Sequence, residues 1–281
     1  MSRGRLRAIK KKVEATQSLM KITRAMEMVA RAKVRKFERA FKGFKEYMNE
    51  LERMREKLPL KGIENPLLEG VGSEVLLVLT SDLGLCGAFN SEIIKAAEEE
   101  ATRLVDFKGY IVVGSRGVSY FRKKGLIKGY EKLYDMPNME VAAEIADHLI
   151  SLVEEKGVGK VEVVYGQLVN ALIQRPKVIK LLPIEATEGD SMVELEPDVA
   201  SMAEDFLYFY ISSKLLYLMF ETKVSEYYAR QNAMKNATDN ANEMIRTLTL
   251  EYNKARQASI TQEIIEIVNG AEALKEIEEA G

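Results

Sequence analysis

Apolar and small residues recur every three or four positions along the first part of the chain. The stretch Arg5–Lys57 contains one glycine and no proline. A single heptad frame holds over it, which predicts one continuous helix with an apolar stripe along one side. Thr16, Thr23 and Glu27 interrupt the stripe, so we expect weaker packing there than in the Phe-rich part. The seam positions are Leu6, Ile9, Val13, Thr16, Met20, Thr23, Glu27, Ala30, Val34, Phe37, Phe41, Phe44, Met48, Leu51 and Leu58.

The last third of the chain has the same kind of pattern. Neither glycine nor proline occurs between Pro197 and Gly270. A strict seven-residue repeat over this length implies a left-handed supercoil. We expect the two segments to form one antiparallel coiled coil within the chain, although an intermolecular coiled coil would show the same seams. The second seam is Phe206, Tyr210, Ser213, Tyr217, Phe220, Val224, Tyr227, Gln231, Met234, Thr238, Ala241, Ile245, Leu248, Tyr252, Ala255 and Ser259.

The lengths of the two helices imply that part of the pair projects from the remainder of the chain. At 1.5 Å per residue, the helices are about 85 Å and about 120 Å long. The intervening residues would form a domain with a radius of gyration of only about 14 Å. Aligning Leu58 with Val199 places Met26 level with Arg230 and Gln231.

In this alignment Met1 falls near Arg256 and Gln257, so the last ~24 residues have no partner helix. An unpaired apolar helix is unstable in water, so another molecule must enclose this tip. The apolar positions of the tip are Ile260, Ile264, Ile267, Val268 and Leu274.

Between the two helices, short apolar runs alternate with helical patterns. This alternation predicts an open, largely parallel α/β domain of Rossmann-like class. We expect three parts: a first coiled-coil helix in 1–58, the α/β domain in 59–197 and a second coiled-coil helix in 198–281. The predicted strands are Glu74–Thr80, Tyr110–Gly114, Val161–Tyr165 and Val178–Leu182, and the predicted helices are Ser91–Val105, Val118–Lys124 and Val141–Glu155.

Charge is distributed unevenly along the chain. Residues 1–57 carry 18 Lys and Arg against 7 Asp and Glu, whereas residues 198–281 carry 8 against 14. Opposite net charge favours pairing of the two helices. The basic first helix also predicts an acidic neighbour, either a protein surface or nucleic acid.

The sequence offers no chemistry for catalysis or for binding a cofactor. Neither GxxxxGK[ST] nor GxGxxG follows a predicted strand. The glycines of Ser81–Gly87 lack phosphate-loop spacing, so a tight turn is expected there, with Asp82 as a cap. Cys86 is the only cysteine and His148 the only histidine, which argues against a disulfide, a structural zinc site or a nucleophile–base pair. No apolar run is long enough to span a bilayer.

Three stretches resemble the gamma subunit of the F-type rotary ATP synthases. The first is Lys21–Ala30 (KITRAMEMVA), followed by Arg31-Ala32-Lys33. The second is Ser81–Asn90 (SDLGLCGAFN). The third runs from Ala233 to Leu274 and contains AMKNATDNA, LTLEYNKARQASITQEIIEIV and NGAEAL. The resemblance covers both ends and the centre of the chain in the order expected for this family.

This resemblance implies a central rotor shaft without a catalytic site or cofactor of its own. In the family, the helix pair occupies the cavity of a ring of three alpha and three beta subunits. The globular end sits on the ring of membrane c subunits beside the epsilon subunit. Ion flow turns the c ring and the shaft, which drives ATP synthesis in the beta subunits; hydrolysis drives ion pumping in reverse. The expected location is the cytoplasmic face of the cell membrane, peripheral and held only through partners.

The resemblance also implies contact residues. Val193–Asp198 (VELEPD) resembles the segment that meets the c ring, which suggests Leu195 and Glu196, although the aromatic residues of some relatives are missing. The central domain lacks the cysteine pair of the chloroplast thiol switch, and the helix that starts almost at Met1 favours a bacterial protein. Residues expected to face the alpha/beta ring are Met26, Arg230, Arg256, Gln257 and Thr261.

Two other functions are compatible with parts of the sequence. Arg3–Lys12 and Lys33–Lys45 could make the chain a nucleic-acid-binding coiled-coil scaffold, although these stretches carry no base-stacking aromatic residues on their polar faces. Binding to DNA with a steep salt dependence would support that scaffold. The α/β domain could instead belong to a nucleotide-dependent enzyme, which saturable nucleotide binding by the isolated chain would indicate.

Overall fold

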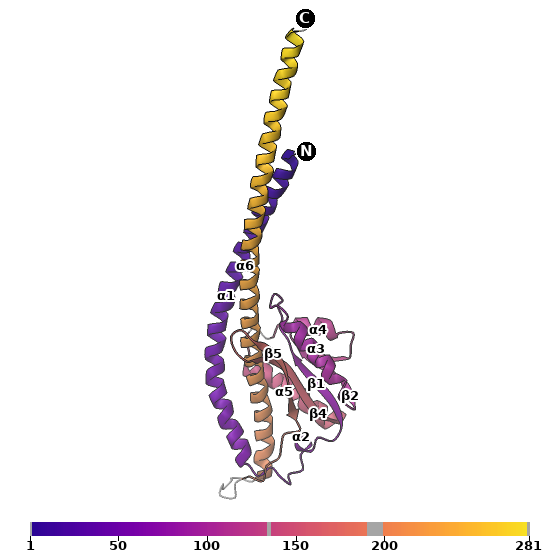
Figure 1. The fold of residues 1–281 in the computed structure, drawn as a ribbon. Helices are drawn as coiled ribbons and strands as arrows, with labels where there is room; N and C mark the ends of the chain where they lie inside the picture. The colour runs from indigo at the N-terminus through magenta and orange to yellow at the C-terminus, as the bar shows by residue number, and fades with distance from the viewer. Residues whose placement is uncertain (1, 134–135, 190–198, 280–281) are drawn as a thin grey trace. The chain divides into compact units, whose positions relative to one another are not determined.

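The computed structural model describes residues 2–133, 136–189 and 199–279. The chain forms two compact units, one of Met1–Met28 with Met234–Gly281 (unit 1) and one of Val29–Ala233 (unit 2). Helices α1 (Ser2–Lys57) and α6 (Val199–Glu279) contribute to both units. The predicted fold class is confirmed: the N- and C-terminal segments are helical and the centre contains a mostly parallel sheet (Figure 1).

The five-stranded sheet in unit 2 has the order β3-β2-β1-β4-β5. Strands β1 to β4 are parallel to one another, and β5 is antiparallel to β4. The sequence predicted four of the strands but missed β3, a short edge strand that is half exposed and has no continuous apolar run. The strands are β1 (Ser73–Leu79), β2 (Phe107–Val113), β3 (Leu126–Tyr130), β4 (Val158–Leu168) and β5 (Gln174–Leu182).

Side-chain caps define the starts of two of the shorter helices. Asn65 Oδ1 accepts a hydrogen bond from the Leu67 amide (2.9 Å), and Asn138 Oδ1 accepts one from the Val141 amide (2.9 Å). Each cap satisfies an amide that has no partner in the first turn of its helix. The three predicted helices of this domain are present with shifted ends, and α2 is an addition. The bounds are α2 (Pro66–Glu69), α3 (Phe89–Ala101), α4 (Ser115–Phe121) and α5 (Met139–Lys156).

Alternating residues of the strands form a separate core on each face of the sheet. On one face Val75, Leu77 and Leu79 join a cluster with residues of α1, α5 and α6. On the other face Leu76 and Val78 join a cluster with residues of α3 and α4. Because side chains alternate along a strand, both faces of β1 are apolar and both are covered by helices. The layers are visible in Figure 1.

Helix α6 has different surroundings in the two units. In Ile211–Tyr227 every residue except Lys214 and Tyr217 is buried. A two-helix seam would bury only the heptad positions, but here Leu215, Leu218 and Met219 are buried too, because the sheet and α5 share their core with this part of α6. The sequence predicted the seam toward α1 correctly, but it did not predict this second buried face.

Aromatic pairs join α1 to α6 in unit 2. Phe37 and Tyr227 stack with their ring centroids 5.3 Å apart. The rings of Phe41 and Tyr217 are 5.2 Å apart, and those of Phe44 and Phe220 are 6.0 Å apart. These pairs confirm the predicted Phe-rich seam, and the partner rings come from α6.

In unit 1, hydroxyl groups take part in the seam. The Oγ1 atoms of Thr23 and Thr238 are hydrogen-bonded at 2.8 Å, and both residues are buried. Thr16 is also buried and donates to its own helix at Lys12 O (2.8 Å). The threonines therefore fit the seam rather than interrupt it.

The register of the two helices in unit 1 differs from the one expected. Pairing of Thr23 with Thr238 shifts the facing residues on α6 by about one helical turn toward the C-terminus. Met26 therefore lies near the level of Lys235, and the predicted register, which placed Met26 level with Arg230 and Gln231, is wrong. The whole α/β domain, rather than a short turn, separates the end of α1 at Lys57 from the start of α6 at Val199 in the sequence, so these ends do not fix the register of the pair.

Glu221 is a buried carboxyl group on the face of α6 toward the sheet, with only 6% of its surface exposed. Its Oε1 accepts a hydrogen bond from the Leu168 amide at 3.3 Å. Burial raises the pKa of Glu221, and the hydrogen bonds from Leu168 and Tyr165 oppose that rise only in part.

Replacing Phe37 by alanine tests the aromatic seam. Phe37 is 1% exposed, so Phe37→Ala should lower the free energy of unfolding by about 3–5 kcal/mol through lost burial and a residual cavity. Urea unfolding followed by circular dichroism measures the change. Phe209→Ala is the matched control because Phe209 is 45% exposed, and it should cost about 1 kcal/mol or less. Equal losses would contradict the proposed importance of the seam.

Replacing Glu221 by glutamine tests the buried carboxyl group. Because its pKa is raised in the folded state, Glu221 supports stability most below its unfolded pKa of about 4.3, and that support is lost as the pH rises through the folded pKa. Glu221→Gln keeps a carbonyl acceptor but cannot ionise. The stability of the variant relative to the unmodified chain should therefore increase between pH 4 and pH 7, measured by urea unfolding. Glu243→Gln, at an exposed position of α6, should change less; the same trend in both would refute the assignment.

Candidate functional site

The carboxyl ends of β1 and β4 lie side by side in the sheet. From β1 the chain continues through α3 on one face, whereas it enters β4 from α5 on the other face. Open α/β sheets bind their ligands at such a switch point, outside the carboxyl ends of the strands. Two loops lie there: residues 80–88 after β1 form the first edge loop, and residues 169–173 between β4 and β5 form the second edge loop.

The first edge loop is held by the Ser81 side chain and by Asn90 of α3. Asn90 Oδ1 accepts from the Ser81 amide (3.0 Å), and Asn90 Nδ2 donates to Ser81 Oγ (2.8 Å). Ser81 Oγ donates to Leu83 O (2.6 Å). Leu85 has a φ of 63°, a left-handed conformation that is uncommon for a residue with a branched side chain. Its side chain is 61% exposed.

Asp82 is a cap, as predicted. Its Oδ1 accepts hydrogen bonds from the amide and the hydroxyl of Ser115, both at 2.8 Å, and from the Lys132 amide at 3.0 Å. Ser115 is the first residue of α4. The carboxylate thus ties the end of β1 to the start of α4 and to the segment after β3, which is a structural use of the group.

Arg230 of α6 binds the first edge loop. Its Nη2 donates to Leu83 O (3.0 Å) and to Gly84 O (3.2 Å). Nη1 lies 2.6 Å from Glu226 Oε1, and the other oxygen of Glu226 lies 3.1 Å from Lys223 Nζ. All three charged side chains are at least nine-tenths buried. Tyr227 also lies beneath the guanidinium, with its ring centroid 5.0 Å from Arg230 Cζ.

Two further residues of α6 bind the end of β4 and the second edge loop. Glu221 accepts from the Leu168 amide, and Asn232 Nδ2 donates to Ala171 O at 2.9 Å. Side chains of α6 therefore reach the carboxyl ends of both β1 and β4. The switch point, where related architectures hold a ligand, is used in this chain to hold its own helix.

The two side chains most often associated with nucleophilic or acid–base chemistry are poorly placed for it. Cys86 is buried, which raises the pKa of its thiol, so the reactive thiolate is disfavoured. His148 lies on α5, where burial and the nearby Lys128 and Lys156 lower its pKa. Among the described residues no cluster of three His, Cys, Asp or Glu side chains is arranged to hold a metal ion. No helix in the described part of the chain has the length and apolar character needed to cross a membrane.

The predicted contact residues have different environments. Arg256, Gln257 and Thr261 are exposed on α6, and the Thr261 hydroxyl donates to Gln257 O of its own helix (3.0 Å). Met26 is half-buried on α1, whereas Arg230 is buried at the first edge loop. Leu195 and Glu196 lie outside the described residues. The structure contains no partner chain, so all seven contacts stay predictions.

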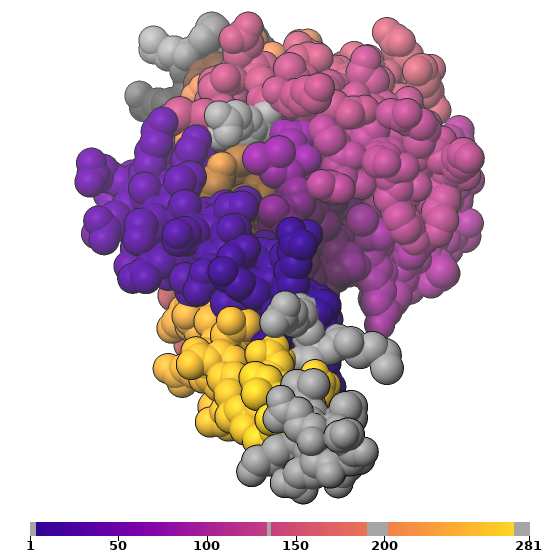
Figure 2. Space-filling view, turned by 90° about the horizontal axis from the view of Figure 1, so that it is seen from above, coloured from indigo at the N-terminus to yellow at the C-terminus, as the bar shows by residue number. Residues whose placement is uncertain are grey.

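The end of α6 exposes a series of large apolar side chains. The exposed fractions are 45% for Ile260, 55% for Ile264, 47% for Ile265, 71% for Ile267 and 49% for Val268. Every residue from 260 to 272 is exposed, and this part of α6 is yellow on the surface in Figure 2. The exposure agrees with the predicted unpaired apolar tip up to Val268, and the side chain of Leu274, its last predicted position, lies outside the described part of the chain.

A second apolar stripe on α1 was not recognised from the sequence. Leu19 and Ile22 are 54% and 56% exposed. With Met26 they share a spacing of three and four residues, which places them on one face of the helix beside the seam. The signal is present in the sequence as apolar residues spaced three and four apart, but the longer seam on the adjacent face of α1 masks it.

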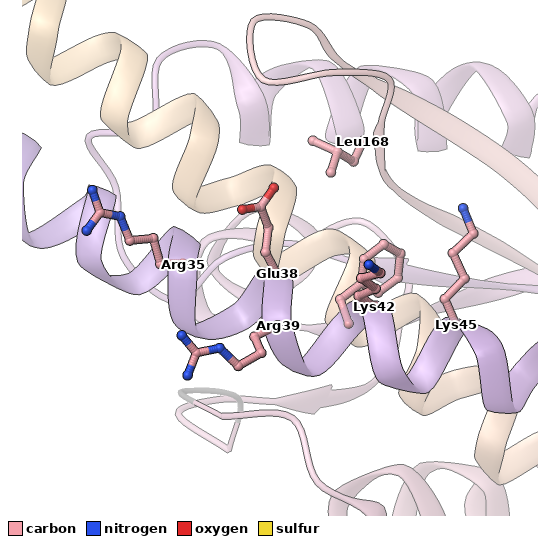
Figure 3. Close-up of a pocket in the computed structure, with 7 residues that line it drawn as sticks. Arg35, Glu38, Arg39, Lys42, Lys45 and Leu168 are labelled. Atoms are coloured by element: carbon pink, nitrogen blue, oxygen red, sulfur yellow. The ribbon is translucent and has the colours of Figure 1, made fainter.

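A shallow basic groove lies between α1 and the end of β4. It has a volume of about 560 Å³, with Phe41 and Leu168 as apolar lining residues. Glu38 and Lys45 point to the side of α1 on which Leu168 lies, and Arg39 points to the other side (Figure 3). Glu38 accepts a hydrogen bond from the Tyr228 hydroxyl at 2.6 Å. The cationic lining residues are Arg35, Arg39, Lys42 and Lys45.

Solved structures share this fold. A chain of the mitochondrial ATP synthase of Euglena gracilis, from its OSCP/F1/c-ring structure, superimposes with a TM-score of 0.73 at 20% identity, over 96% of this chain and 95% of that one. A chain of the central stalk/c-ring structure of the Tetrahymena thermophila enzyme gives a TM-score of 0.59 at 26% identity, over 77% of this chain and 99% of that one.

Sequence comparisons extend the similarity to the family level. The model of the ATP synthase family matches residues 5–274. The ATP synthase gamma chain of Symbiobacterium thermophilum is 37% identical, over 96% of this chain and 98% of the relative. The gamma chain of a Synechococcus species is 35% identical, over 96% and 99%. Since the match extends over nearly the whole of both proteins, this chain belongs to the family of ATP synthase gamma chains.

Proposed function

We propose that this chain is the central rotor shaft of an F-type ATP synthase. It couples rotation of the membrane c ring to ATP synthesis in the beta subunits, and ATP hydrolysis to ion pumping in the reverse direction. Membership of the gamma chain family carries this proposal. The exposed apolar end of α6 supports it, because a shaft that turns inside a ring needs an end that the ring encloses.

The proposed partners are three alpha and three beta subunits around the helix pair, and the c ring with the epsilon subunit at the α/β domain. The Euglena structure is an OSCP/F1/c-ring assembly, and the Tetrahymena structure is a central stalk with its c ring. In the bacterial setting the chain would be peripheral at the cytoplasmic face of the cell membrane and attached only through its partners. We propose the c-ring contact at Leu195 and Glu196, within a functional α/β domain of 59–197.

Contacts with the alpha/beta ring are proposed at Met26, Arg256, Gln257 and Thr261. The last three are exposed on α6. Exposed ion pairs contribute only about 0–1 kcal/mol each. Contacts of this strength suit a shaft that has to leave each orientation in turn. Because Arg230 is buried, it would contribute to the ring contact indirectly, by holding the first edge loop in position.

The basic groove on α1 is proposed to receive acidic segments of the beta subunits. Four cations line it around Phe41 and Leu168, so it can attract an acidic segment and shield apolar side chains on that segment. Opposite charge across an interface mainly accelerates association and selects the partner. The comparisons give no support to the alternative of a nucleic-acid-binding scaffold.

Reconstitution tests the proposed function. The chain should co-purify with alpha and beta subunits of a gamma-free hexamer and increase its steady-state ATP hydrolysis. Failure to join the hexamer, together with unchanged hydrolysis, would refute the shaft assignment.

The exposed polar contacts on α6 can be tested in the same assay. Arg256→Ala with Gln257→Ala should reduce assembly or coupled turnover several-fold, because their side chains are exposed in the isolated chain and would contact the ring. Thermal unfolding of the isolated chain should hardly change. Arg246→Ala with Thr247→Ala, also exposed on α6, is the matched control. Equal losses of assembly and of isolated-chain stability would indicate a purely structural role.

The apolar tip gives a separate prediction. Ile264→Ser with Ile267→Ser should leave the isolated chain as stable as before, because both residues are exposed. In the hexamer, each buried isoleucine would be worth about 1.5–3 kcal/mol, so the variant should assemble more weakly in a sedimentation assay. Val105→Ser, at a position that is 97% exposed, should assemble normally; unchanged assembly of the tip variant would contradict an enclosing partner.

A further inference from the structure

We infer that Glu221, Arg230 and Asn232 form a clamp that fixes the angular setting of α6 about its own axis relative to the sheet. The inference rests on the proposed rotor function and deepens it: the clamp is the place where torque passes between the α/β domain and the shaft helix. The α6 clamp denotes these three side chains and the backbone groups that they bind at Leu83, Gly84, Leu168 and Ala171.

The clamp holds α6 from two sides. Arg230 follows Glu221 by nine residues, which is about two and a half helical turns, so the two side chains leave opposite faces of α6. Asn232 follows Glu221 by about three turns and lies on the same side as Glu221. Arg230 binds carbonyl groups of the loop after β1, whereas Glu221 and Asn232 bind the end of β4 and its hairpin.

Hydrogen bonds on two sides of α6 resist rotation of the helix about its own axis, a movement that apolar packing resists poorly. The large buried side chains of this part of α6, such as Ile211 and Leu215, oppose separation of the helix from the sheet. Apolar burial, however, is non-directional. The guanidinium is a rigid, planar fork with fixed donor directions. Rotation of α6 about its axis would break the bonds at Leu83 and Gly84 on one side and at Leu168 and Ala171 on the other.

Burying charged side chains to hold a helix costs free energy, which is justified where the orientation of the helix has to be fixed. Replacing a buried ion pair by apolar residues of similar volume is often neutral or stabilising. Lys223, Glu226 and Arg230 are nevertheless buried together on α6. Glu226 lies between the two cations and positions the guanidinium of Arg230. The guanidinium also donates hydrogen bonds to the loop carbonyl groups of Leu83 and Gly84. This arrangement specifies an orientation, which a shaft needs and a simple core does not.

The first edge loop is shaped to meet the clamp. Leu85 is held at positive φ immediately after the Gly84 carbonyl that Arg230 binds. A side chain added at Gly87 would reach within 3.8 Å of Ala233, one turn beyond Arg230, so the loop follows the same face of α6. Left-handed backbone in a non-glycine residue persists only where surrounding structure enforces it.

Variants that open the clamp without leaving a buried charge unpaired test the inference. Arg230→Lys keeps a positive charge beside Glu226 but loses the fork, and Asn232→Ala removes the bond to Ala171. The double variant Arg230→Lys with Asn232→Ala opens both sides. Arg246→Lys with Asn240→Ala, at exposed positions of the same helix, reproduces the same chemical changes outside the clamp.

The first measurement is hydrogen exchange of the full isolated chain. Amides of residues 83–88 and 169–173 should exchange about tenfold faster in the double variant, because local opening becomes easier. Each single variant should affect mainly the loop that it contacts, and the control should match the unmodified chain. Unchanged exchange in both loops would overturn the clamp itself, independently of the rotor function.

The second measurement uses the complex reconstituted into vesicles with its alpha, beta, epsilon and membrane subunits. The ratio of ATP-driven ion uptake to ATP hydrolysis, both measured on the same vesicles, should fall at least about fivefold in the double variant. Faster exchange with an unchanged ratio would make the clamp a local structural feature and overturn its role in torque. Failure of the unmodified chain to support hydrolysis would overturn the proposed function, and this role with it.

Discussion

Helix α6 has to bury two faces at once in unit 2, and the arrangement of that unit depends on this constraint. One face carries the aromatic seam with α1, in which Phe37 stacks on Tyr227. The other joins the core of the sheet and α5. A helix that is apolar all round is stable only where neighbours enclose it. Because both neighbours are present, the stretch Ile211–Tyr227 is nearly free of exposed residues.

Polar groups add direction to this apolar packing. Doubly wound sheets bind their ligands at the carboxyl ends of the strands. In this chain Glu221, Arg230 and Asn232 of α6 bind the backbone at those ends. Use of that edge by the chain's own helix agrees with the absence of a phosphate-binding motif in the sequence. The α/β domain therefore serves to hold α6. This role is consistent with a non-catalytic gamma chain in a complex whose catalytic sites lie on other subunits.

The surfaces offered to partners have a different character from this interior. Arg256 and Gln257 are exposed on α6, the basic groove on α1 is shallow, and the apolar tip carries Ile264 and Ile267 without cover. Solvated charges give weak contacts that can be exchanged. Rigid internal bonds combined with weak polar contacts suit a rotating shaft, because it must keep its own shape while its neighbours change. The apolar tip differs, because an enclosing partner would bury it.

The sequence by itself determined the two long helices, the seam, the unpaired tip and the class of the sheet, because these follow from local periodicity and turn residues. It also predicted the cap at Asp82. Only the tertiary structure decided that Arg230 is buried at Leu83 and Gly84, that Thr23 pairs with Thr238 and that a half-exposed strand forms at the sheet edge. Each of these three features depends on which residue, distant in the sequence, lies opposite in the fold. A periodic pattern defines the buried face of a helix, but it specifies neither the register nor the partner of that face.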